Sequence, residues 1–391
     1  MKILYLGSSH FADCDFPLVK ALQDMGYDVT YLILLTPNSK RTTLFDIKTI
    51  IHQNNIIKAT DYSELQVYTS YMDMTKVYIV NRSCKKESSW AAFHLMVKIA
   101  RMIKKEKFDI IHTDVIFKMH NAFLYLLFSR WILTVHDPFP HTGEDSFKVR
   151  FFRKLAFKKA KSFVLLNSTQ KHHFCKTFNI NERKVLVNSL GVYDSIRLFL
   201  RREISCPAKI CEENNVLFFG RISPYKGVDY LCRAMLKVRD VIPNATLTIA
   251  GGGMLYFDIN PYLEKGIVEV KNHYIGMEEL ACLLTKCTVV VCPYTDATQS
   301  GVVMTAFSLY KPVIATRTGG LAEQIDNGKT GFIVPPKDAN ALADEIIKIL
   351  REEKIRNQLK NNIKKKFEKG EQNWRHIAEK YIDFYQKQCI L

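Results

Sequence analysis

The chain has 391 residues, of which 47% are hydrophobic and 12% aromatic, enough apolar side chains for two sizeable cores and therefore two domains. An excess of 56 Lys and Arg over 39 Asp and Glu gives a net charge of +17, which favours anionic partners such as nucleotides, phosphorylated lipids or a membrane surface. No two of the ten cysteines have the spacing of a zinc knuckle or redox pair, and no apolar run is long enough to cross a bilayer, so we expect a cytoplasmic protein whose cysteines are small hydrophobes.

The first half of the chain predicts alternating strands and helices, the pattern of a Rossmann-like domain without a GxGxxG fingerprint. Strands are predicted at 2–6, 27–35, 108–114, 131–137, 162–168 and 184–191. Helices are predicted at 17–25, 91–105, near 122–128 and at 169–178. Residues 36–90 are polar and mixed, and we expect an insertion there.

The second half repeats the pattern after a charged boundary at 194–213. Strands are predicted at 215–221, 245–253, 266–272, 289–292 and 312–315, and helices at 227–239, 277–286, from residue 300, after residue 320, and at 340–350, 351–367 and 373–386. We therefore predict an α/β protein with two doubly wound domains facing a cleft. The expected bounds are 1–195, 205–372, and 373–391 for a terminal helix that packs back on the first domain.

Two loops of the second domain have features of an anion site. Backbone N–H groups of Ser300, Gly301 and Val302 stand at the start of a predicted helix, and Gly319 and Gly320 precede another. Helix N-termini attract anions, and small residues let a phosphate approach closely. Either loop taken alone is explained equally well as a turn.

Arg221 and Lys226 lie five residues apart on the loop after the strand predicted at 215–221. A planar guanidinium can bind two oxygens of a diphosphate, and a mobile ammonium can follow its charge. As the bond to a diphosphate breaks, fixed cations stabilise the growing negative charge. The alternative is a pair of solvated surface cations.

Six segments, taken in order, carry a resemblance that covers nearly the whole chain: TVHD (134–137), VLLNSTQ (164–170), FFGRISPYKG (218–227), ATLTIAGGG (245–253), VVVCPY (289–294) and YKPVIATRTGGLAEQIDNGKTGFIVPP (310–336). Together they resemble the GT-B glycosyltransferases of family four, retaining enzymes that transfer sugars from nucleotide donors. The resemblance implies an acceptor-binding first domain and a donor-binding second domain.

Site residues are expected in three groups. Catalytic roles fall to His136, Arg221 and Lys226. The donor is expected at Gly220, Arg221, Lys226, Tyr274, Ile275, Gln299, Ser300, Gly301, Val302, Thr305, Gly319 and Gly320. The acceptor is expected at Ser8, Ser9, His10, Asp137 and His141.

The chain departs from the family pattern where most members carry two glutamates eight positions apart. Alignment on Pro293 and Lys311 places Ala297 and Thr305 there. We therefore expect Gln299 and the amides of 300–302 to hold the donor, with Thr305 reaching the ribose weakly or not at all. Asp13 and Asp15 resemble a metal-binding DxD motif, but they lie in the acceptor half, so we expect no metal and no other cofactor.

Residues 148–163 contain seven cations interleaved with Phe151, Phe152, Leu155 and Phe157, and Ile103, Lys104 and Lys105 are expected to extend the same face. Such a helix suits docking on anionic lipid, at the inner face of the plasma membrane. The alternative is a helix whose aromatic side lies in the core and whose lysines are solvated.

These observations predict a retaining, metal-independent glycosyltransferase. It would move a hexosyl or N-acetylhexosaminyl group from a nucleotide-diphosphate sugar, UDP being favoured, to a glycan or polyprenyl-diphosphate-linked acceptor in surface polysaccharide or lipopolysaccharide assembly. Two alternatives stay open: a non-catalytic nucleotide-sugar-binding scaffold and a GT-B sugar-nucleotide epimerase. A nucleic-acid partner is not expected, since no recognition module accompanies the positive charge.

Overall fold

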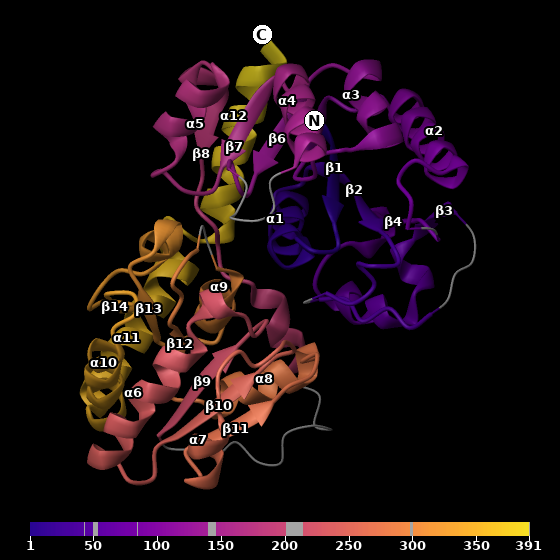
Figure 1. The fold of residues 1–391 in the computed structure, drawn as a ribbon. Helices are drawn as coiled ribbons and strands as arrows, with labels where there is room; N and C mark the ends of the chain where they lie inside the picture. Colours follow the sequence, from indigo (N-terminus) through magenta and orange to yellow (C-terminus); the bar gives the residue numbers. More distant parts are fainter. Residues whose placement is uncertain are drawn as a thin grey trace. The chain divides into compact units, whose positions relative to one another are not determined.

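A computed structural model describes the chain except for residues 43, 50–53, 84, 140–145, 201–213, 298–299 and 391, and except for the side chains of 389 and 390. It divides into two compact units. Unit 1 consists of residues 1–190 and 374–391, and unit 2 of residues 191–373 (Figure 1). Each unit is built around its own parallel sheet.

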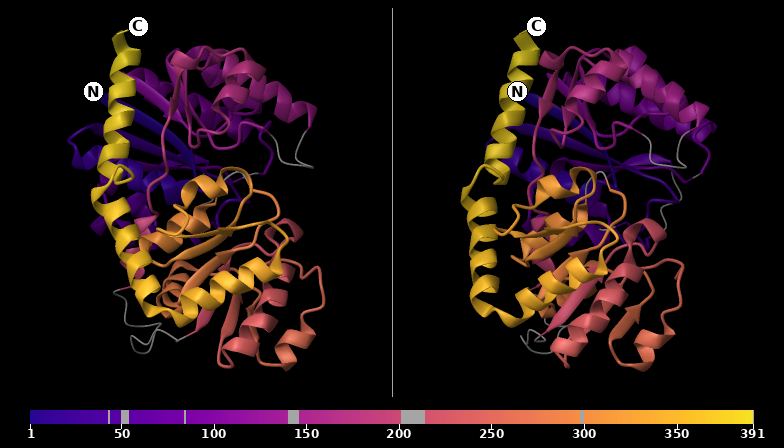
Figure 2. Two further views of the ribbon diagram at one scale, coloured as in Figure 1. Left: turned by 90° about the vertical axis from the view of Figure 1, so that its left-hand side faces the viewer. Right: turned by 60° about the vertical axis from the view of Figure 1, so that its left-hand side comes forward.

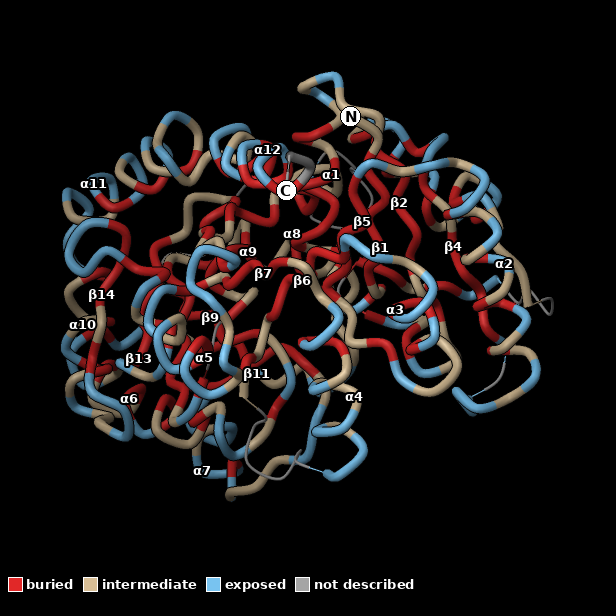
Figure 3. The backbone as a smooth tube through the Cα atoms, turned by 90° about the horizontal axis from the view of Figure 1, so that it is seen from above, coloured by how far each residue is buried: buried red, intermediate tan, exposed pale blue. Residues whose placement is uncertain are grey.

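Unit 1 contains an eight-stranded sheet in the order β3-β4-β2-β1-β5-β6-β7-β8, in which only the β3–β4 pair is antiparallel. The strands are β1 (Lys2–Ser8), β2 (Asp28–Leu35), β3 (Asn55–Lys58), β4 (Val77–Asn81), β5 (Ile110–Thr113), β6 (Trp131–Val135), β7 (Ser162–Leu165) and β8 (Val185–Val187). The central strands are buried along their length, as parallel strands covered on both faces must be (Figure 3).

One face of this sheet is covered by α2 (Trp90–Glu106), α3 (Leu124–Leu127), α4 (Phe147–Lys159) and α5 (Lys171–Phe178). Leu95, Ile99, Phe157 and Phe174 from these helices join Trp131 in one apolar cluster. The helices therefore owe their position to the apolar stripes that they bury.

The opposite face carries α1 (Ala12–Asp24) and α12 (Trp374–Ile390), which pack on each other; Figure 2 shows α12 running beside the unit 1 strands. Buried polar contacts fix α12 to the sheet. The Ser162 hydroxyl donates to Gln388 Oε1 at 2.6 Å, the Asn188 side-chain amide donates to the Ile377 carbonyl at 3.1 Å, and His112 Nδ1 pairs with the Tyr385 hydroxyl.

Unit 2 contains a six-stranded parallel sheet in the order β11-β10-β9-β12-β13-β14. Its strands are β9 (Asn215–Phe219), β10 (Thr246–Ala250), β11 (Val268–Lys271), β12 (Val289–Cys292), β13 (Val313–Thr316) and β14 (Gly331–Val334). Its helices are α6 (Val228–Val241), α7 (Asn260–Glu264), α8 (Met277–Lys286), α9 (Gly301–Ser308), α10 (Ala339–Arg351) and α11 (Glu353–Lys364). This is the strand order of a doubly wound sheet. The chain builds the sheet outward in one direction from β9 to β11 and in the opposite direction from β12 to β14.

The predicted fold class is confirmed, with three local differences. Residues 36–90, to which no strand or helix was assigned and where an insertion was expected, contain β3, β4 and short 3₁₀ helices. Helix α1 begins at Ala12 rather than at Pro17, and Asp15 in its first turn accepts hydrogen bonds from Tyr5 of β1 and Tyr31 of β2. Residues 191–199 belong to unit 2, where Arg197 donates to the Ser308 carbonyl at 2.8 Å, so the boundary falls earlier than expected.

The basic and aromatic segment at 148–163 is divided between core and surface. Phe157 and Phe163 are buried in the apolar cluster, and so is Ile103, which contradicts its expected place on a docking face. Phe147 and Phe151 of α4 are 77% and 55% exposed. Within the described residues, no helix has the length and apolar character needed to cross a bilayer.

Candidate functional site

The switch in strand order in unit 2 lies between β9 and β12. The two strands pair only through Val216 with Val289 and Leu217 with Val290, so the carboxyl-end halves of both strands are unpaired with each other. In open parallel sheets ligands bind at the carboxyl ends of the strands at such a point. Arg221 and Lys226 follow β9 there.

Glycines let the loops at this edge approach each other closely. Gly220 has φ +118°, and a Cβ on Gly251 would lie 2.0 Å from the Gly220 carbonyl oxygen. Gly227 has φ +63°, and a Cβ there would lie 2.1 Å from the Pro293 carbonyl oxygen. The backbones that leave β9, β10 and β12 are therefore held together by contacts that only glycine allows.

Lys226 has a strongly lowered pKa at this edge of the sheet. Its ammonium lies 3.6 Å from the centre of the buried Tyr294 ring, and Arg221, which is exposed, has a guanidinium nitrogen 3.5 Å from the Tyr225 hydroxyl. Burial lowers the pKa of Lys226 to about 8, and the nearby positive charge of Arg221 acts in the same direction. The two cations thus stand together, as their spacing predicted, in a setting that favours binding of an anion.

The loop before α9 differs from our expectation in one respect. The Ser300 N–H, expected to be available for a phosphate, donates to Gln324 Oε1 at 2.9 Å, and Gln324 Nε2 donates back to the Ser300 carbonyl at 3.2 Å. The expectation of a free Ser300 amide is therefore wrong for this conformation. Gly301 and Val302 form the first turn of α9, where backbone N–H groups have no acceptor within the helix.

The remaining expected donor residues are distributed around the same edge. Thr305 is buried, and its hydroxyl donates to the Gly301 carbonyl at 2.9 Å. Gly319 and Gly320 begin a 3₁₀ helix after β13. Tyr274 and Ile275 lie on the loop after β11, and the Tyr274 backbone nitrogen is next to Gly252. Gln299 lies outside the described residues.

The expected acceptor residues belong to unit 1, after β1 and β6. Ser8 Oγ accepts the His10 N–H at 3.3 Å, and His10 is exposed. Ser9 is buried and donates its hydroxyl to the Ser39 carbonyl at 2.8 Å, so this side chain serves the fold. Asp137 is half-buried, and His141 lies outside the described residues.

His136 lies at the carboxyl end of β6 against the loop that follows β1. Its ring stacks on Phe11 with 3.8 Å between centroids and 5° between planes, and its Nε2 lies 3.5 Å from Asp114 Oδ2. Burial lowers the pKa of His136, while the Asp15 carboxylate opposes this effect. Burial therefore disfavours the charged form of the imidazole, and the Phe11 ring holds it in a fixed orientation.

Asp13, Asp15 and Asp114 gather next to His136. Asp15 accepts hydrogen bonds from Tyr5 at 2.9 Å and Tyr31 at 2.7 Å. Burial raises the pKa of Asp13 to about 7 and that of Asp114 to about 8, and it raises the pKa of Asp15 as well. Because like charges this close cannot all ionise, the group retains protons near neutral pH. Among the residues that the structure describes, no group of three or more His, Cys, Asp or Glu side chains has an arrangement that could hold a metal ion.

Three contributors were missed by sequence reasoning. Gln324 and Tyr294 are hydrogen-bonded to Ser300, from which they are 24 and 6 residues away in the chain. No sequence motif indicates these contacts. Asp114 was detectable, because it is a carboxylate at the end of an apolar strand, the position at which parallel sheets carry functional side chains.

Both units match known protein families. The family described as "Glycosyltransferase Family 4" matches residues 17–195, and the family described as "Glycosyl transferases group 1" matches residues 203–366. Between them, the two matches cover most of unit 1 and nearly all of unit 2.

Among relatives, two uncharacterized glycosyltransferases of Methanocaldococcus jannaschii are 29% and 26% identical. The first match covers 62% of this chain and 64% of the relative, and the second covers 85% and 94%. A Campylobacter jejuni N,N'-diacetylbacillosaminyl-diphospho-undecaprenol alpha-1,3-N-acetylgalactosaminyltransferase is 24% identical over 62% of this chain and 64% of its own length.

Two solved structures share the fold along the whole chain. Sucrose-phosphate synthase of Thermosynechococcus elongatus has a TM-score of 0.64 at 19% identity and covers 99% of both chains. Anabaena HepE, solved with UDP and glucose, has a TM-score of 0.63 at 18% identity and covers 99% of this chain and 98% of its own. From the family matches and the fold together, the chain belongs to the GT-B glycosyltransferases of family four.

Proposed function

We propose that this chain is a retaining, metal-independent glycosyltransferase. It moves a hexosyl or N-acetylhexosaminyl group from a nucleoside-diphosphate sugar, UDP being favoured, to a glycan or lipid-linked glycan acceptor in surface polysaccharide assembly. The observation that carries the proposal is the Arg221 and Lys226 pair at the strand-order switch of unit 2. The UDP complexes of Anabaena HepE and the lipid-linked acceptor named for the Campylobacter relative support the choice of donor and acceptor class.

In the proposed reaction the bond between sugar C1 and the diphosphate breaks as the acceptor oxygen bonds to C1 on the same face. The leaving phosphate oxygen takes the proton of the acceptor hydroxyl. Arg221 and Lys226 stabilise the negative charge that grows on the diphosphate, which is the part that a metal ion plays elsewhere. His136, held by Phe11, donates a hydrogen bond to the transferred sugar.

A thermal-shift panel tests the donor class. The protein is melted with UDP, GDP, TDP, ADP and CMP, each at about 100 times its dissociation constant, where a bound ligand adds about 2.7 kcal/mol of stability. One diphosphate should stabilise the wild type but neither Arg221→Ala nor Lys226→Ala. Lys265→Ala is the matched control, because Lys265 is an exposed cation at the end of α7 in the same unit. A shift that survives in both site variants would contradict the assignment.

A non-catalytic scaffold is the second candidate, and one observation favours it. Thr305 replaces a family glutamate, and its buried hydroxyl is engaged with the Gly301 carbonyl. Nucleotide binding without sugar transfer or sugar release would establish the scaffold. Interconversion of a UDP-sugar in the absence of acceptor would instead identify an epimerase.

We also propose that unit 1 associates peripherally with anionic membranes. Beside the exposed Phe147 and Phe151 of α4, the contacting helix α3 exposes Leu126 by 54% and Leu127 by 58%. Apolar side chains flanked by lysines and arginines insert into the interface of anionic bilayers. Phe147→Ser/Phe151→Ser should lower co-sedimentation with anionic liposomes. Leu263→Ser, which removes an exposed leucine from unit 2, should leave it unchanged. Equal binding of all three proteins would refute the docking face.

A further inference from the structure

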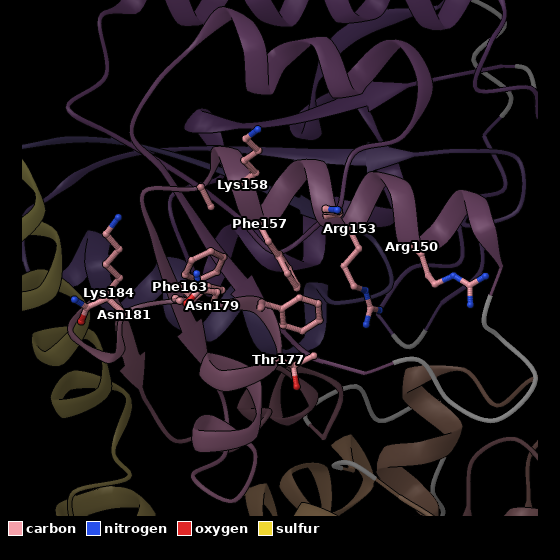
Figure 4. Close-up of a pocket in the computed structure, with 13 residues that line it drawn as sticks. Arg150, Arg153, Phe157, Lys158, Phe163, Thr177, Asn179, Asn181 and Lys184 are labelled. Atoms are coloured by element: carbon pink, nitrogen blue, oxygen red, sulfur yellow. The ribbon is translucent and has the colours of Figure 1, made fainter.

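A pocket of about 750 Å³ lies in unit 1 between α4 and α5 (Figure 4). It is lined by one side of α4, the start of β7, the end of α5 and the loop that leads to β8. Its volume falls within the range of about 300–1,000 Å³ that small-molecule sites occupy. Neither the donor site nor the His136 site uses any of these lining residues.

The charged lining residues of the pocket are all basic. Of its thirteen lining residues five are basic and none is acidic: Arg150, Arg153, Lys154, Lys158 and Lys184. Arg150, Lys154 and Lys158 follow one another at four-residue spacing along α4, and Arg153 lies directly before Lys154. Arg153 Nη1 donates to the Pro138 carbonyl at 2.7 Å, and a cluster of like charges of this kind attracts an anion.

Five of the eight remaining lining residues are apolar, and Thr177, Asn179 and Asn181 are uncharged polar residues. Phe157, Phe163 and Phe178 line it together, with the Phe157 ring 5.7 Å from Phe163 and 4.7 Å from Phe178 between centroids. An inorganic anion or a sugar phosphate would gain little from these rings. The combination fits a ligand that carries an anionic group and a hydrocarbon chain.

The position of the pocket on α4 identifies the source of such a ligand. Phe147 and Phe151, the exposed phenylalanines of this helix, are one turn apart and neighbour Arg150 and Lys154 on the helix surface. A helix that places these rings in the bilayer interface brings its four lining cations to the level of the phosphates. A lipid molecule can then enter the pocket from the membrane itself.

We propose that this pocket binds a single anionic phospholipid, with the phosphate held by Arg150, Lys154 and Lys158 and the first methylenes of an acyl chain against Phe157 and Phe178. The inference rests on the membrane association proposed above. It deepens that proposal, because it replaces diffuse attraction to negative charge with a site for one lipid.

Binding of dihexanoyl-phosphatidylglycerol, a short-chain lipid used below its micelle concentration, tests the site by calorimetry on the full chain. The pocket variant is Arg150→Glu/Lys158→Glu. The matched control is Lys148→Glu/Lys159→Glu, which reverses two exposed cations of the same helix, also one near each end, that do not line the pocket. We expect wild-type affinity in the control and at least a tenfold loss in the pocket variant. Affinity should rise about fourfold for each methylene that the pocket buries.

Two results would overturn the proposal. Equal losses in both double variants would mean that only the overall charge of α4 matters. Inorganic phosphate binding as tightly as the lipid would mean a simple anion site.

If the double variant unfolds, Lys184→Glu with its exposed neighbour Arg183→Glu as control repeats the comparison on the loop. The UDP shift of the wild type is measured in parallel. If only the UDP shift is absent, the donor assignment in unit 2 is contradicted and the proposed lipid site is not.

Discussion

The titration of Lys226 gives the sharpest test of the donor site. Burial lowers the pKa of this ammonium from 10.5 to about 8 in the free protein. A bound diphosphate stabilises the charged form, so binding raises the pKa back toward its ordinary value. Affinity is therefore fully present below pH 8 and is lost as pH rises above it. The protonated fraction is about 0.9 at pH 7 and about 0.09 at pH 9, which predicts a loss of about tenfold.

Calorimetry of UDP binding at pH 7, 8 and 9, at constant ionic strength, measures this loss. Lys226→Arg is the matched control, because a guanidinium stays charged throughout this range. Titration of the uracil ring affects both proteins equally, so the difference between them isolates the lysine. The reasoning is refuted if wild type and Lys226→Arg lose affinity in parallel.

Three further predictions address the loops and the histidine. Gly227→Ala should destabilise unit 2 by at least about 2 kcal/mol more than Gly266→Ala in thermal melts, because both have φ +63° but only the Cβ at 227 meets a backbone carbonyl. Gln324→Leu should cost about 1–3 kcal/mol in denaturant unfolding, since it leaves the buried N–H of Ser300 unpaired, whereas Gln324→Glu keeps the acceptor and should cost less. His136→Ala should lower kcat about 10²–10³-fold with little change in the UDP dissociation constant, and an unchanged kcat would remove His136 from the mechanism.

Elements with a strong local signal could be predicted from the sequence. The expected bounds 277–286 and 289–292 are those of α8 and β12, because an amphipathic stretch is followed at once by an uninterrupted apolar run. β4 was missed although it pairs with β2 and β3 inside the sheet. Its five residues stand in polar surroundings, and only the neighbouring strands, distant in sequence, make it a strand.

Site residues within a contiguous motif could likewise be predicted, whereas those that depend on distant contacts could not. The Arg221 and Lys226 pair follows from a contiguous motif with glycines at fixed positions, so its loop could be recognised. The role of Gln324 could not, because a buried amide that pairs with both backbone groups of Ser300 has no sequence pattern. The start of α1 was missed for a related reason. Asp13 and Asp15 were considered only as a DxD motif, yet Gly7 leaves the space on β1 that the Asp15 carboxyl group fills.

The environment of Lys226 also argues that the site is built for an anion from outside the fold. No carboxylate among the described residues pairs with this ammonium, and its neighbours are the Tyr294 ring, the Tyr225 ring and the positive charge of Arg221. A methionine would pack on Tyr294 without the cost of a buried charge, so Lys226→Met should raise the melting temperature of the ligand-free protein at pH 7 by a few degrees while abolishing the UDP shift. A stabilised variant that still binds UDP would show that the ammonium serves neither the fold nor the donor. A destabilised one would show that the lysine belongs to the fold.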